Sequence, residues 1–194
     1  MVDLHGQYLR IKPEIDQAIQ SVLDSSAFIQ GPHVKEFEKA FSAFHQGSHV
    51  ISCGNGTDAL QIAMMALGFK PGDEVILPVF TYVATAEVIA LLGLKPVFAD
   101  VDEKTFNIDV DQIEKKITKK TVAIVPVHLF GQSAAMESLM SLAKKFNLHV
   151  IEDFAQSIGA VYSFPDGVSK KVGDRKSTRL NSSHERLSRM PSSA

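Results

Sequence analysis

The hydrophobic positions of this chain first follow a helical spacing and then form short apolar runs that alternate with helical segments. Residues 10–24 and 31–44 each place an apolar side chain every three or four residues, which predicts two amphipathic helices. From residue 49 onward, apolar runs typical of buried strands alternate with longer segments of helical period. The predicted strands are residues 49–56, 73–80, 95–101, 121–131 and 149–157, and the predicted helices between them are residues 57–69, 82–94, 109–117 and 136–147.

This alternation predicts an α/β fold with a mostly parallel sheet and helices on both of its faces. The strands are nearly continuous apolar runs, as expected where both faces of a sheet are covered. In such sheets ligands bind beyond the carboxyl ends of the strands. The candidate functional residues are therefore those that directly follow each strand.

Composition limits the classes of function without naming one. With 194 residues and 45% hydrophobic content, the chain is large enough for one domain with a substantial core. A net charge of −2 gives no reason to expect nucleic acid or a membrane as a partner. The single cysteine, Cys53, excludes an internal disulfide, and the N-terminus lacks the apolar region of a signal peptide. We therefore expect a cytoplasmic protein.

The stretch GNGTDA at residues 54–59 fits the G-x-G-x-x-A pattern of a dinucleotide-binding turn. A Rossmann site also needs an acid at the end of the second strand, and that strand, which ends in LPVFTY, has none there. Asp73 and Glu74 stand at its beginning, so the sequence disfavours NAD(P). The turn still suits one phosphate, because N–H groups at the start of a helix attract an anion and Thr57 adds a hydroxyl donor. A capped turn without a ligand is the alternative.

Asp153 follows a buried strand, where an ionised carboxylate is costly unless it has a partner. The protonated ring nitrogen of pyridoxal 5'-phosphate (PLP) is such a partner, and PLP enzymes use an acid there to keep the ring an electron sink. Gln156 is placed to reach the phenolic oxygen of the same ring. The alternatives are an aspartate that caps the next helix and a glutamine that is only a polar loop residue.

Two further side chains follow strand ends. Tyr82 could stack on a flat cofactor, although an aromatic residue here is more often part of a core. His128 fits either a catalytic imidazole or a buried, hydrogen-bonded one. The four histidines before residue 50 have no metal-ligand spacing, so no metal is expected. A phosphate turn, a stacking aromatic ring and an acid for a ring nitrogen together indicate PLP.

From about residue 2 to residue 173 the chain resembles the DegT/DnrJ/StrS family of PLP-dependent sugar aminotransferases. Within that family it looks most like enzymes that aminate C3 of a UDP-linked 3-keto hexuronic acid for surface polysaccharide. The resemblance rests on six segments in family order, FIQGPHVKEFEKAF, SCGNGTDALQIAMMAL, GDEVILPVFTYVATAEVI, PVFADVD, PVHLFGQSA and VIEDFAQSIGA.

The resemblance implies the large domain of a fold type I PLP enzyme, here truncated at its C-terminal side, and a homodimer. Its implied partners are a nucleotide-linked keto sugar and an amino donor, with glutamate expected. The implied cofactor contacts are the backbone around Gly56, Thr57 and Asp58 for the phosphate and the side chains of Tyr82, Asp153 and Gln156 for the ring. The implied substrate-side residues are Phe28, Gly31, Pro32 and His128.

Two positions depart from the family pattern. Phe154 stands where the family often has alanine, and we expect it to face away from the ring and to affect packing only. The lysine that forms the Schiff base should follow Asp153 by about thirty residues, near Asn181, and no lysine there has the family context. Lys170 and Lys171 come too early. The catalytic residue therefore stays unassigned.

The last residues explain this gap. The segment DRKSTRLNSSH is what one frame of a widely used short-read sequencing adapter encodes, and the closing SRMPSSA matches a later part of the same adapter. We therefore expect residues 1–173 to be a partial PLP-binding large domain and residues 174–194 to be adapter read-through. A family member that dehydrates its sugar, or a non-catalytic fragment, remains an alternative to the aminotransferase.

Overall fold

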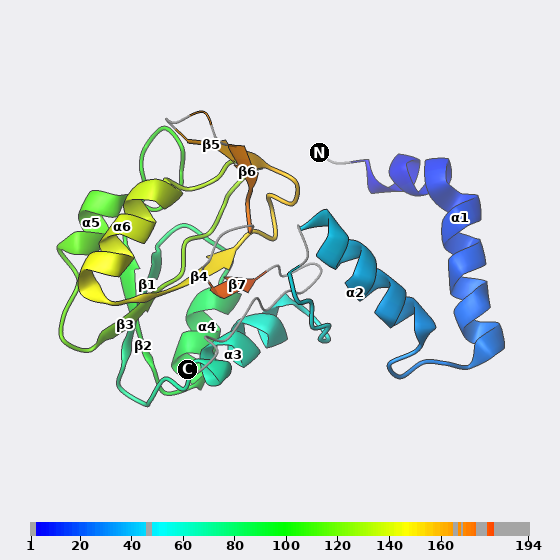
Figure 1. Ribbon diagram of the computed structural model, residues 1–194, viewed down its shortest axis with the longest axis horizontal. Helices are drawn as coiled ribbons and strands as arrows, with labels where there is room; N and C mark the ends of the chain where they lie inside the picture. Colours follow the sequence, from blue (N-terminus) through cyan, green and yellow to red (C-terminus); the bar gives the residue numbers. More distant parts are fainter. Residues whose placement is uncertain (1–2, 46–47, 165–166, 168, 174–177, 181–194) are drawn as a thin grey trace. The chain divides into compact units, whose positions relative to one another are not determined.

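The computed structural model describes residues 3–45, 48–164, 167, 169–173 and 178–180, and the chain forms two compact units, Met1–Phe41 and Ser42–Ala194 (Figure 1). Helix α1 (Leu4–Ser25) begins where the Asp3 carboxylate accepts the Gly6 N–H at 2.8 Å, and it ends at Ser26 in a left-handed conformation. Helix α2 (Pro32–Phe44) begins at a proline, which the first turn of a helix tolerates. Both helices predicted from the apolar spacing are confirmed.

The second unit is built on a five-stranded parallel sheet, with the order β2-β1-β3-β4-β7, and has a two-stranded antiparallel hairpin, β5-β6. The helices that alternate with the strands confirm the predicted α/β fold. Its strands are β1 (Glu74–Pro78), β2 (Lys95–Ala99), β3 (Thr121–Ile124), β4 (His149–Asp153), β5 (Val161–Ser163), β6 (Ser169–Lys171) and β7 (Thr178–Leu180). Its helices after α2 are α3 (Gly56–Ala66), α4 (Ala84–Leu91), α5 (Val110–Glu114) and α6 (Met136–Phe146).

Both faces of the sheet are covered, as the apolar strands predict (Figure 1). Val75 and Leu77 of β1 belong to one hydrophobic cluster with residues of α3 and α4. Ile76, which points to the opposite face of the same strand, belongs to a second cluster with residues of α5 and α6. The sheet therefore separates two cores and fixes the positions of the loops at its carboxyl edge.

One predicted strand does not form. Residues 48–53 precede α3 without strand structure, although the apolar pattern of residues 49–56 predicts a strand. A strand needs a neighbour for its N–H and C=O groups, and among the described residues none forms a ladder with this segment. Apolar patterning identifies a segment that can pair, but the partner must come from elsewhere in the fold.

The segment predicted to be adapter sequence lies mostly outside the described residues. Within it, Thr178–Leu180 form β7, which runs parallel to β4. Its assignment to adapter read-through stays a prediction.

Among the described helices, none has both the length and the apolar content to cross a membrane.

Candidate functional site

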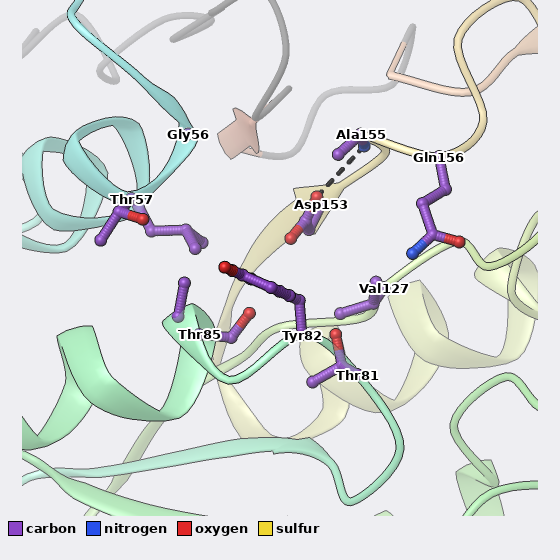
Figure 2. Close-up of a pocket in the computed structure, with 11 residues that line it drawn as sticks. Gly56, Thr57, Thr81, Tyr82, Thr85, Val127, Asp153, Ala155 and Gln156 are labelled. Carbon is purple, nitrogen blue, oxygen red and sulfur yellow. Dashed lines mark hydrogen bonds between the residues drawn. The ribbon is translucent and has the colours of Figure 1, made fainter. Parts of the chain in front are cut away.

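A cavity of about 300 Å³ opens at the carboxyl edge of the sheet, where the sequence predicts the site (Figure 2). Its walls come from the start of α3, the segment that leads into α4, and the residues that follow β3 and β4. It is lined by Gly56, Thr57, Leu60, Thr81, Tyr82, Ala84, Thr85, Val127, Asp153, Ala155 and Gln156.

The start of α3 supplies backbone donors at one side of the cavity. The extended Asn55 caps the helix, because its side-chain oxygen accepts the Asp58 N–H at 2.9 Å. Gly56 and Thr57, which begin the helix, line the cavity. A helix start of this kind attracts an anion such as a phosphate group. Since the Asp58 N–H is used by the cap and Asp58 does not line the cavity, its predicted phosphate contact is not favoured by this geometry.

Asp153 is the last residue of β4 and lines the cavity. Only 6% of this residue is exposed. Among the described residues, the one hydrogen bond that it accepts comes from the Ala155 N–H at 3.1 Å (Figure 2). Burial raises the pKa of this carboxyl, and the hydrogen bond from the Ala155 N–H only partly opposes that effect. A cationic group in the cavity would remove the cost of burying this charge.

The raised pKa of Asp153 predicts a pH-dependent loss of stability in the cofactor-free protein. The contribution of the Asp153 carboxyl to the free energy of unfolding is fully present below about pH 3.9, the pKa of an aspartate in the unfolded chain. That contribution is lost as pH rises through the higher pKa of the folded protein. Asp153→Asn removes the titration, so its melting temperature should gain on that of the wild type as pH rises above about 4. Thermal unfolding across a pH series checks this, and a difference that does not change with pH would contradict it.

Two further predicted residues project into the cavity. Tyr82 is an exposed residue that lines the cavity. In Figure 2 its side chain lies between Asp153 and the start of α3. The Gln156 side-chain oxygen accepts the Phe130 N–H at 3.3 Å, and its amide nitrogen faces the cavity (Figure 2). Gln156 therefore presents a donor to an oxygen of a bound molecule.

His128 is fully buried and does not line the cavity. Its Nδ1 accepts the Ala134 N–H at 3.0 Å, so the neutral ring carries its proton on Nε2, which lies 3.3 Å from the Glu152 carboxylate. The structure thus matches the buried, hydrogen-bonded alternative for His128, and a substrate-side role is not favoured.

The other predicted positions divide by location. Phe28, Gly31 and Pro32 lie in the first unit, and their role beside the substrate stays a prediction. The sequence interpretation gave no role to the buried Thr85, to Val127 or to Ala155, although Thr85 and Ala155 follow strands where the site was expected. Thr85 lies in the first turn of α4 and the other two follow strand ends, so only their position, not their chemistry, could have identified them.

The cavity matches PLP in three of its chemical features. A helix start suits the phosphate, a buried carboxylate with no ion pair among the described residues suits the ring nitrogen, and an amide donor suits the phenolic oxygen. Together with the two-faced parallel sheet, these features are the ones expected of the cofactor-binding domain of a fold type I PLP enzyme.

Comparison with known proteins gives the family. A profile of the DegT/DnrJ/EryC1/StrS aminotransferase family matches residues 9–185, and the chain belongs to this family. It is 53% identical over 161 residues to the UDP-2-acetamido-2-deoxy-3-oxo-D-glucuronate aminotransferase of Pseudomonas aeruginosa, covering 83% of this chain and 45% of that protein. It is 52% identical over 163 residues to the pleiotropic regulatory protein of Geobacillus stearothermophilus, covering 84% of this chain and 44% of that protein.

A solved structure agrees with these sequence matches. DesV of S. venezuelae superposes with a TM-score of 0.83 at 36% identity and covers 92% of this chain and 46% of that one. The predicted fold class and family are therefore confirmed. The chain spans about 45% of the length of the curated relatives named above.

Proposed function

We propose that this chain supplies the cofactor-binding part of a PLP-dependent aminotransferase that transfers an amino group from glutamate to a nucleotide-linked keto sugar. The observation that carries the proposal is the buried Asp153 carboxylate, which faces a cavity that also contains the start of α3. The P. aeruginosa relative, whose name states a UDP-linked 3-oxo sugar as substrate, supports the substrate class. A UDP-linked 3-keto hexuronic acid, used for cell-surface polysaccharide, is the specific substrate that we propose.

Five residues of the cavity have a part in this proposal. The N–H groups of Gly56 and Thr57 and the Thr57 hydroxyl bind the phosphate. Asp153 keeps the ring nitrogen protonated, Gln156 donates to the phenolic oxygen, and Tyr82 covers a face of the ring. When bound, PLP acts as an electron sink for the substrate carbon that loses a proton.

No lysine is among the described residues that line the cavity. We propose that the whole protein supplies the catalytic lysine from sequence that belongs after Gly173, and that it works as a cytoplasmic homodimer. A histidine at that position would instead indicate the sugar dehydratase of the same family. Resequencing the gene across the Gly173 codon decides between these residues. If DRKSTRL were found in clean genomic sequence, the proposed read-through would be rejected.

The reaction is tested with the protein expressed from its complete coding sequence. Incubation with PLP, nitrogen-labelled glutamate and the UDP-linked 3-keto hexuronic acid should place the labelled nitrogen on the sugar, as read by mass spectrometry. Release of water from the sugar without incorporation of nitrogen would favour the dehydratase. If the sugar stayed unchanged while PLP bound, the proposed substrate would be wrong.

A further inference from the structure

We infer that Phe130 is a positioning residue that orients the Gln156 amide toward the bound cofactor, an inference that rests on the function proposed above. The relevant segment, the 129–132 turn, follows β3 and consists of Leu129, Phe130, Gly131 and Gln132. Phe130 does not line the cavity itself, so it acts through Gln156 rather than by contact with a ligand.

The 129–132 turn holds Gln156 at two atoms. The Phe130 N–H donates to the side-chain oxygen Oε1 of Gln156 at 3.3 Å, and the Gly131 N–H donates to the main-chain oxygen of Gln156 at 3.1 Å. A carboxamide has one oxygen and one nitrogen, so a bond that holds the oxygen also fixes where the nitrogen points. In Figure 2 that nitrogen faces the cavity, which makes Gln156 a donor and selects an acceptor oxygen on the ligand.

The backbone of Phe130 is in a conformation that a phenylalanine rarely adopts. Its φ is 55°, in the left-handed region, where a side chain crowds the backbone. A residue stays in such a conformation only when its surroundings hold it there, and strained residues are often found at functional sites. At this position the strained conformation accompanies the N–H bond to Gln156 Oε1.

Two other aromatic rings contact Phe130 and provide that support. Phe80 follows β1 and Phe106 follows β2, and the centroid of each ring lies 6.4 Å from that of Phe130. Their own centroids are 5.8 Å apart, so the three rings form a triad across three successive strand ends. Phe130 as a residue is 70% exposed and is not part of the buried core, so the packing of its ring acts on the local turn.

The turn is anchored independently on its N-terminal side. The His128 N–H donates to the Asp153 main-chain oxygen at 2.9 Å, and the Ser157 hydroxyl donates to the His128 main-chain oxygen at 2.8 Å. These bonds do not involve the Phe130 ring. Loss of that ring should therefore release the tip of the turn, and with it the orientation of Gln156, without unfolding the strand end.

A double-mutant cycle on the affinity for PLP tests the inference in the protein expressed from its complete coding sequence. Phe130→Ala and Gln156→Leu should each weaken PLP binding by about 3- to 10-fold, the range expected for one hydrogen bond. The double variant should be no weaker than the weaker single variant, because both changes remove the same interaction. Phe130→Tyr, which keeps the ring, should bind as the wild type does.

Matched variants separate positioning from stability. Phe146→Ala removes another exposed ring, at the end of α6 and away from the cavity, and should leave PLP affinity unchanged. If Phe130→Ala does not fold, Phe130→Gly replaces it, because glycine accepts a left-handed backbone without strain. Additive losses in the cycle, unchanged affinity in the Phe130 variant, or an equal loss in Phe146→Ala would overturn the inference while the proposed function stands. If the wild type failed to bind PLP, both would fall.

Discussion

Asp153→Ala is expected to lower the rate of transamination by about a hundred- to a thousandfold, the range found when one preorganised electrostatic contact is removed from an active site. The carboxylate lies in the cavity, and its function in the proposal is to hold a proton on the ring nitrogen. Without this carboxylate a bound PLP ring would be a weaker electron sink, so the rate should fall. Initial rates of the protein expressed from its complete coding sequence, measured with saturating PLP, separate this effect from weaker binding.

Asp100→Ala is the matched control for this prediction. Asp100 also follows a strand, β2, but it is exposed and does not line the cavity. Its substitution should leave the rate within about twofold of the wild type, since surface changes away from a site have small effects. If Asp153→Ala kept the wild-type rate, or if both variants lost the same amount, Asp153 would not be the acid that faces the ring.

Phe154→Ala is expected to lower the free energy of unfolding by about 3–5 kcal/mol, as found when a fully buried phenylalanine is truncated. The Phe154 ring is completely buried, and its centroid lies 5.6 Å from that of His45. A Cβ on Gly173 would come within 2.8 Å of the Phe154 ring, which shows how closely this ring is packed. Denaturant unfolding of the cofactor-free protein measures the loss.

The affinity for PLP distinguishes the role of Phe154 from that of the neighbouring Asp153. Phe154 does not line the cavity, as expected from the sequence, so the folded fraction of Phe154→Ala should bind PLP as the wild type does. Phe154→Leu is the control, because it keeps more of the buried volume and should cost less stability than the alanine variant. A stable Phe154→Ala, or one that loses PLP affinity while folded, would contradict the packing role.

Much of the fold could be predicted because local pattern and tertiary packing agree. The apolar runs identified β1 to β4, and the alternation of Val75, Ile76 and Leu77 between the two cores shows why such strands are apolar throughout. Pairing could not be predicted in the same way, because residues 48–53 have the pattern of a strand but no ladder partner within the described chain.

The candidate site was predictable where a residue's chemistry is unusual for its place. A carboxylate after a buried strand needs a partner, and Asp153 does lie in the cavity. His128 could not be assigned in the same way, because a buried imidazole and a catalytic one have the same sequence context. Phe130 could not be identified at all, since its link to Gln156 is a backbone bond that depends on a left-handed φ. Side-chain chemistry is visible in a sequence, whereas backbone donors become visible only in the fold.

The most direct test of the central claim compares PLP with its carbocyclic analogue 1-deaza-pyridoxal 5'-phosphate, which lacks the ring nitrogen. Both ligands are titrated into the wild type and into Asp153→Asn, with binding measured by equilibrium dialysis. We expect the wild type to bind PLP more tightly than the analogue by about 10- to 100-fold, the size of a hydrogen bond to a charged group, and we expect Asp153→Asn to bind the two about equally. Equal affinities in the wild type, or a preference for PLP that survives in Asp153→Asn, would contradict the placement of the ring nitrogen against Asp153.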